Sequence, residues 1–162
     1  MSTRLVQIGQ LVVSADPQEK LKSVGLGSCV AVIVMDAVRN VVAMAHVVLP
    51  RSSASDPGRE KPPAYYADKA IPELLRRMAI HGSSPKTGPL SVKLTGGASL
   101  AGQTSTFNIG KRNILAVKRC LWRHGLTPIA EDVGGTDART VTAEVASQRV
   151  VISTPYKEPA DL

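Results

Sequence analysis

The sequence has few aromatic residues, few cysteines and no long apolar run, and each scarcity argues against a class of protein. Aromatic side chains make up 3% of the 162 residues, which is sparse for base stacking, and no nucleic-acid recognition motif is present. No segment approaches the run of about 18 apolar residues that a membrane-spanning helix needs. The N-terminal residues lack an apolar core long enough for a signal peptide. We therefore expect neither nucleic-acid binding nor membrane insertion.

The chain contains two cysteines, which lie far apart in the sequence. A chain of this length can bury about two thirds of its unfolded surface and needs no disulfide to fold. Such cysteine usage is typical of a reducing compartment, so we expect a cytoplasmic protein. No cysteine and histidine pair has the spacing of a zinc site.

Acidic residues are missing from the middle of the chain. Residues 76–125 hold nine basic side chains and no acidic one, and they supply the whole excess behind the net charge of +7. A basic band of this kind attracts an acidic partner and raises its encounter rate. The alternative is that these residues are simply the solvated faces of helices.

The order of the expected elements predicts an α+β fold. Short β-branched runs indicate strands, and two segments with apolar residues at helical spacing indicate helices. We expect a single domain over residues 1–153 followed by a frayed tail over 154–162, with both helices on one side of the strands. The expected strands are 4–14, 21–24, 30–35, 41–49, 90–95, 126–133, 139–145 and 149–153, and the expected helices are 66–80 and 108–124.

One expected hairpin, over residues 23–50, brings a thiol and an imidazole together. With a two-residue loop of Ala37 and Val38, Cys29 would lie directly opposite His46 on the same face of the sheet. A three-residue loop would instead turn His46 to the other face, because a one-residue slip reverses the facing. The pairing therefore depends on the turn.

A neighbouring imidazole lowers the pKa of a thiol and carries its proton, so this pair could form a nucleophile and its base. The glycines at positions 25 and 27 allow backbone N–H groups to point at a substrate. The hydroxyl of Ser23 could orient the imidazole. The alternatives are that Cys29 is a small buried hydrophobic residue and that His46 is a histidine of the core.

The remaining candidate residues are better explained by structure. His81 and His124 each fall at the expected C-terminus of a helix, where a positive charge complements the helix dipole. Cys120 lies within an expected helix and is interpreted as a packing residue. Neither Gly25-Leu-Gly27 nor Gly96-Gly97 completes a phosphate-binding pattern.

Several motifs resemble the CheD family, the chemoreceptor glutamine deamidases of bacterial chemotaxis. They agree with that family in order and cover nearly the whole chain. The matching segments are Gly25-Leu-Gly-Ser-Cys29, Ala43-Met-Ala-His46-Val-Val-Leu-Pro50, Tyr66-Ala-Asp68, Gly96-Gly-Ala98, Asn108-Ile-Gly110, Arg112-Asn113, and Glu131-Asp132 before Gly134-Gly135.

The resemblance implies hydrolysis of selected glutamines on methyl-accepting chemotaxis receptors to glutamate, without a metal or organic cofactor. It implies a three-layer α/β/β sandwich similar to deamidating cytotoxic necrotizing factor toxins. Cys29 would be the nucleophile and His46 the base. The third position, normally threonine in the family, is Ser23, and the backbone near Gly27 and Ser28 would stabilise the oxyanion.

The resemblance also concerns partners. Receptor cytoplasmic bundles are acidic helical rods, and we expect Arg112, Arg119 and Arg123 of the basic band to dock them. The family also binds the CheC phosphatase, so a non-catalytic adaptor of receptors and a CheC-type partner is the alternative function. The polar loop over residues 51–63 is longer than is typical of the family, and we expect it to form a rim or lid of the site.

Overall fold

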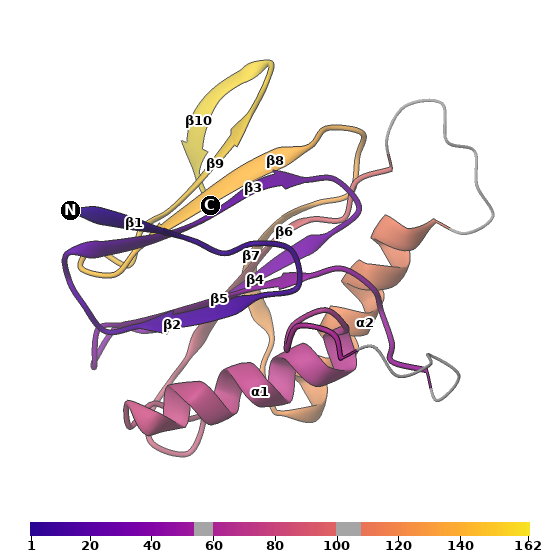
Figure 1. The fold of residues 1–162 in the computed structure, drawn as a ribbon. Coiled ribbons are helices and arrows are strands. Elements are labelled where there is room, and N and C mark those ends of the chain that lie inside the picture. Colours follow the sequence, from indigo (N-terminus) through magenta and orange to yellow (C-terminus); the bar gives the residue numbers. More distant parts are fainter. Residues whose placement is uncertain (54–59, 100–107) are drawn as a thin grey trace.

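A computed structural model describes residues 1–53, 60–99 and 108–162 of the chain (Figure 1). The expected loop over 51–63 therefore falls partly, and the polar segment 100–107 entirely, outside the described residues. In the part that is described, no helix is long and apolar enough to cross a membrane. The strands are β1 (Ser2–Leu5), β2 (Leu11–Ser14), β3 (Glu19–Leu26), β4 (Val30–Asp36), β5 (Val41–Val47), β6 (Ser91–Gly96), β7 (Pro128–Val133), β8 (Arg139–Glu144), β9 (Val150–Thr154) and β10 (Lys157–Asp161), and the helices are α1 (Ala67–Ile80) and α2 (Ile109–Arg123).

The strands form two sheets of five strands each within the described ranges. One sheet has the order β1-β3-β8-β9-β10 and the other has the order β2-β5-β4-β6-β7. Figure 1 shows both helices on the same side of the second sheet, with the first sheet on its opposite side. The expected α+β fold of two packed sheets with helices on one side is confirmed.

The sheet β2-β5-β4-β6-β7 is buried on both faces, which explains why its central strands are almost entirely apolar. Every residue of β4 and β5 is buried. Side chains alternate along a strand, so one set faces the helices and the other faces the first sheet. On β5, Val41, Ala43 and Ala45 belong to the core under the helices, whereas Val42 and Met44 belong to the core between the sheets.

The turn between β4 and β5 differs from the expected two-residue loop. Asp36 pairs with Val41, so four residues form the turn, and Ala31 pairs with His46. The carboxylate of Asp36 accepts hydrogen bonds from the backbone N–H groups of Val38 and Arg39, both at 3.0 Å. Asn40 closes the turn at φ 52°, a left-handed conformation that asparagine tolerates. The prediction that Cys29 directly opposes His46 is therefore wrong.

Both ends of the chain also differ from expectation. The strand expected over 4–14 is interrupted around Gly9, at φ 74°, and its two halves join different sheets. The residues expected to be a frayed tail include β10, which pairs with β9. Arg149 further holds this end through an ion pair with Asp161 at 2.6 Å.

The two helices match the expected positions closely. Asn108 caps α2 by accepting a hydrogen bond from the N–H of Lys111 at 3.2 Å, and His124 follows its last turn. His81 occupies the same place after α1, and Pro72 is accommodated inside that helix. Cys120 is buried in the core between the helices and the sheet, as a packing residue would be.

Candidate active site

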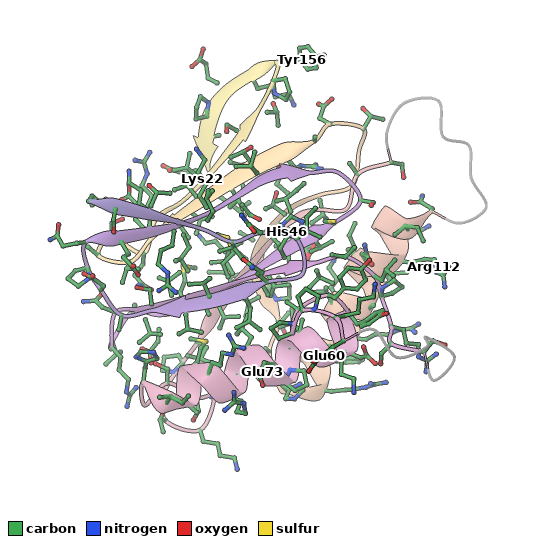
Figure 2. The ribbon with its side chains drawn as sticks, in the orientation of Figure 1. Lys22, His46, Glu60, Glu73, Arg112 and Tyr156 are labelled. Carbon is green, nitrogen blue, oxygen red and sulfur yellow. The ribbon has the colours of Figure 1, made fainter. Side chains whose placement is uncertain are left out.

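His46 lies near the end of β5 and faces the layer between the two sheets, where Figure 2 shows it. It occupies the same face of the strand as Val42 and Met44, and its side chain is 2% exposed. Its backbone is held by the segment before β2, because its N–H donates to Gln10 O at 2.9 Å and its carbonyl accepts from Gly9 N at 3.0 Å. The imidazole is therefore fixed by a strand on a rigid sheet.

A chain of hydrogen bonds sets the protonation state of this imidazole. The Oγ of Ser23, on β3, donates to the carbonyl of Val6 at 2.8 Å and lies 2.8 Å from Nδ1 of His46. A hydroxyl has one proton to donate, so Ser23 must accept the second hydrogen bond from Nδ1–H. Nε2 then carries the free lone pair. It is buried, and no partner for it is found among the described residues.

Burial keeps the thiol and the imidazole neutral. Desolvation lowers the pKa of His46 from its ordinary 6.5, and a hydrogen bond to the Val6 backbone opposes this shift. Desolvation raises the pKa of the Cys29 thiol above 9.0, against a smaller opposing effect of its own backbone N–H. At neutral pH the thiol is therefore protonated, and an unprotonated Nε2 is ready to accept its proton.

Cys29 lies in the short connection between β3 and β4, where it is partly exposed and packs against the core between the sheets. Ala31 pairs with His46, so Cys29 is displaced by two residues along the strand direction. A displacement of two residues preserves the face. The expected shared face of thiol and imidazole is thus retained, but the pair is diagonal rather than directly opposed.

Three consecutive carbonyls, those of Gly27, Ser28 and Cys29, are each held by a hydrogen bond. Gly27 O accepts from the N–H of Ala98 at 2.8 Å, and Cys29 O accepts from the N–H of Gly97 at 2.8 Å. Ser28 O accepts from Nδ2 of Asn113 at 2.9 Å. In a trans peptide the N–H points opposite to the carbonyl, so the N–H groups of Ser28 and Cys29 point away from these donors. They are suited to stabilise an oxyanion.

The glycines after β6 permit this close approach. A Cβ at Gly96, which has φ 110°, would lie 2.2 Å from the carbonyl oxygen of Cys29. A Cβ at Gly97 would lie 2.5 Å from the side chain of Ile114 on α2. The Gly96-Gly97 pair, which did not fit a phosphate-binding pattern, thus acts as a backbone support for Cys29.

Asn113 contacts the segments beside both candidate residues, a role that was not predicted for it from the sequence. It is fully buried on α2, and its Nδ2 donates to Ser28 O and also to Val48 O, both at 2.9 Å. It therefore links the segment before Cys29 to the segment after His46. The signals in the sequence were its place in the matching segment Arg112-Asn113 and a polar residue on the apolar side of an amphipathic helix.

Comparison with known proteins identifies the family. Residues 48–154 match the family model described as CheD chemotactic sensory transduction. The chain belongs to the CheD family. The matched region begins after His46. It therefore does not include Cys29 or His46.

Three curated CheD relatives align over nearly the whole chain. A probable chemoreceptor glutamine deamidase CheD of Syntrophotalea carbinolica is 42% identical over 96% of both chains. A protein of the same name from Methanococcus maripaludis is 38% identical over 92% of this chain and 93% of its own. The chemoreceptor glutamine deamidase CheD of Thermotoga maritima is 38% identical over 92% of this chain and 90% of its own.

A hollow of about 320 Å³ opens beside the imidazole of this CheD-family chain. His46 lines it together with the partly exposed Lys22 and with Gln7, and apolar side chains form the rest of its wall. These apolar residues are Leu5, Val6, Ile8 and Val24. The hollow beside His46 therefore has a mainly apolar wall.

The three arginines expected to dock a partner lie around a separate cavity of about 280 Å³. Arg112, Arg119 and Arg123 of α2 line it together with Arg51. Asp68 lies in the same wall, where its carboxylate accepts hydrogen bonds from the N–H and Oγ of Ser52. Over the described ranges, no cluster of three histidine, cysteine or acidic side chains could hold a metal ion.

Proposed function

We propose that this chain hydrolyses glutamine side chains of chemotaxis receptors to glutamate, using Cys29 as nucleophile, His46 as base and Ser23 as the group that orients the base. The observation that carries the proposal is the hydrogen-bond chain from Val6 O through Ser23 to Nδ1, which leaves Nε2 of a neutral imidazole free on the face that Cys29 shares. The names of the curated CheD relatives support the substrate class.

The first half of the reaction forms a thioester. As Sγ of Cys29 attacks the carboxamide carbon, the thiol proton passes to Nε2 of His46, and the carbonyl electron pair moves onto oxygen. The N–H groups of Ser28 and Cys29, oriented through the Gly27 and Ser28 carbonyls, donate to that oxygen. The intermediate then collapses, and His46 returns the proton to the nitrogen that leaves as ammonia.

The second half of the reaction releases glutamate. His46, neutral again, takes a proton from water as the water oxygen attacks the thioester carbon. A second oxyanion forms at the same backbone donors and collapses with cleavage of the carbon–sulfur bond. The proton held by His46 returns to the thiolate. Each proton is carried by one imidazole, so this mechanism requires no cofactor.

The family and the basic residues of α2 support chemotaxis receptors as partners. The proposal places the reaction in the cytoplasm, where the receptors' helical bundles would dock at Arg112, Arg119 and Arg123. Reversing the charge of these three arginines should weaken receptor binding and its dependence on salt. A CheC-type phosphatase as a second partner remains a prediction from the family resemblance.

Mass spectrometry of receptor fragments tests the proposed function. The wild-type chain should convert specific glutamines to glutamates, which adds the mass difference between an amide and an acid at those positions. The variant Cys29→Ala should leave the fragments unchanged, while Cys120→Ala serves as a matched control that removes the other thiol. Deamidation that survives Cys29→Ala would overturn the assignment of the nucleophile.

A further inference from the structure

The outward face of α2 carries apolar side chains that the fold leaves exposed. Leu115 is 48% exposed and Trp122, the sole tryptophan of the chain, is 77% exposed. Arg112 and Arg119 lie on the same side of the helix, because residues spaced by three, four or seven positions share a face. We call this set of four residues the α2 stripe.

The arginine-lined cavity lies along one side of the α2 stripe. Arg51, Arg112, Arg119 and Arg123 line it, and their four guanidinium groups make no hydrogen bond or ion pair with any residue that the structure describes. Four guanidinium groups around one cavity, with one carboxylate nearby, favour the entry of an anionic group. Planar guanidinium groups match carboxylates in a bidentate manner.

An apolar groove of about 360 Å³ lies along the other side of the α2 stripe. Trp122, Leu126 and Pro128 contribute to its wall. Lys118, at its edge, is paired with Glu131 at 2.7 Å. Leu115 and Arg119 line both this groove and the arginine-lined cavity, so the two hollows are separated by a ridge of two side chains.

We propose that the α2 stripe binds an acidic amphipathic α-helix, which places apolar side chains in the groove beside Trp122 and carboxylates in the arginine-lined cavity. The inference rests on the proposed function in one respect: the helix belongs to the receptor whose glutamines are hydrolysed. Beyond the proposed function, it states that the binding surface is both apolar and basic. It also assigns Arg51, Leu115 and Trp122 to that surface.

The shape of the surface favours a helix over a nucleic acid. Ridges of one helix pack into the grooves beside the ridges of another, and the α2 stripe is a ridge between two hollows. From Arg112 to Trp122 it is about 15 Å long, because an α-helix rises about 1.5 Å per residue, and this length accommodates about three turns of a partner. Single-stranded nucleic acids bind on successive aromatic platforms, whereas the α2 stripe has one aromatic residue.

The position of the α2 stripe relates it to the nucleophile. Arg112 adjoins Asn113, whose side chain bonds the carbonyl of Ser28 on the other side of the same helix. Figure 2 shows Arg112 near the end of the molecule where α2 begins, and the hydrogen bond from Asn113 to Ser28 O places this part of α2 next to the β3 to β4 connection. A helix on the α2 stripe would thus extend toward the segment that contains Cys29.

Trp122 is a built-in probe of the proposed contact. In the full chain carrying Cys29→Ala, which removes turnover, titration with a recombinant acidic receptor cytoplasmic fragment should shift tryptophan emission to shorter wavelength as the indole leaves water. Leu115→Ser and Arg119→Glu should each weaken the affinity at least about tenfold. An unchanged emission when the fragment is bound, as judged by sedimentation, would overturn the proposal.

Matched variants separate the α2 stripe from general effects of charge and apolarity. Lys157→Glu makes the same charge reversal on β10, and Val38→Ser removes an apolar side chain in the β4 to β5 turn that is even more exposed than Leu115. Both should leave the affinity unchanged. An equal loss of affinity in these controls, or an equal emission shift with a duplex DNA of the same net charge, would also contradict the proposal.

Kinetics separate the failure of this inference from failure of the proposed function. With wild-type Cys29, Leu115→Ser and Arg119→Glu should raise KM for the receptor fragment at least about tenfold and leave kcat unchanged. Turnover of a short unstructured glutamine peptide should not change. If wild-type protein deamidates neither substrate, the proposed function fails, and the fluorescence titration still decides whether the helix binds. An unchanged KM for the fragment would refute the role of the α2 stripe.

Discussion

The hydroxyl of Ser23 makes two hydrogen bonds in the candidate site, and a single substitution can test what they contribute. Its hydroxyl accepts from Nδ1 of His46 and donates to the carbonyl of Val6. Ser23→Ala removes both hydrogen bonds, so the imidazole loses the partner that fixes its tautomer. We expect kcat for receptor deamidation to fall about 100-fold, the scale of a general-base contribution.

The variant Ser23→Thr tests this interpretation, because threonine keeps the hydroxyl that makes both hydrogen bonds. It should retain most of the wild-type kcat, while circular dichroism should show all three proteins folded. A kcat for Ser23→Ala equal to that of the wild type would remove Ser23 from the site and leave Cys29 and His46 in place.

The pH profile reports on His46. Burial lowers its pKa below 6.5, so the neutral imidazole persists at pH values where an exposed histidine is already protonated. The acidic limb of kcat/KM should therefore have its midpoint below 6.5. A midpoint at or above 6.5 would contradict the buried neutral base.

The same shift has a consequence for stability. Below pH 6.5 the unfolded chain binds a proton at this histidine more readily than the folded chain does. The free energy of unfolding should therefore decrease as the pH falls through this range. Urea denaturation of wild type and His46→Gln would measure the part of this decrease that His46 causes.

At the scale of elements, α2 connects the helical layer to the segment that contains Cys29 through one side chain. Asn113 donates to the carbonyls of Ser28 and Val48. Asn113→Ala would leave both carbonyls without this donor, and we expect a loss of about 1–3 kcal/mol in the free energy of unfolding. A positioning role predicts in addition that kcat falls at unchanged KM.

The substitution Asn113→Asp is the sharper comparison, since it keeps the size of the side chain and removes its N–H donors. It should reduce kcat at least as much as Asn113→Ala, because a carboxylate would face two carbonyl oxygens. Gly134→Ala, at a glycine with open space around its missing Cβ, controls for mild destabilisation. If its kcat fell by the same factor, the effect at Asn113 would be one of stability alone.

The elements that the sequence predicted best are those whose boundaries are local. The helix expected over 108–124 agrees with α2, since its cap Asn108 and its terminating Gly125 lie beside its own apolar pattern. The expected register of β4 and β5 was wrong because the turn between them is shaped by a side chain: Asp36 accepts hydrogen bonds from two backbone N–H groups. The sequence left the length of the turn open, although Asn40 is a residue suited to the left-handed closing position.

Long-range contacts account for what the sequence could not predict. Asn113 and Ser28 are 85 positions apart, and no periodicity relates them. The strand expected over 4–14 divides between two sheets, which local alternation of apolar residues cannot indicate. By contrast, the shared face of Cys29 and His46 survived the register error, because an offset of two residues preserves the facing.

At the scale of the whole molecule, charge should govern the encounter with the receptor. The excess of positive charge lies in residues 76–125, and four arginines surround the cavity beside α2. Raising the ionic strength from about 0.1 M to about 1 M shortens the Debye length from about 10 Å to about 3 Å. We expect kcat/KM for an acidic receptor fragment to fall at least about tenfold over this range.

A short uncharged glutamine peptide provides the comparison, because its encounter does not depend on the field of the protein. Its kcat/KM should stay constant over the same range of salt. An equal decrease for both substrates would show that salt acts on the active site itself. Steady-state assays of ammonia release measure both substrates under identical conditions.

The three layers separate two tasks that many enzymes combine in one cleft. His46 and Ser23 lie between the two sheets, whereas the proposed receptor surface lies on the outer side of the helical layer, with Asn113 joining the two. Substitutions on the solvent side of α2 can thus accumulate without disturbing the hydrogen bonds that tune the imidazole. Under the proposed function, receptor specificity can therefore evolve through substitutions at a few exposed positions of α2. The residues that carry out the hydrolysis would stay the same.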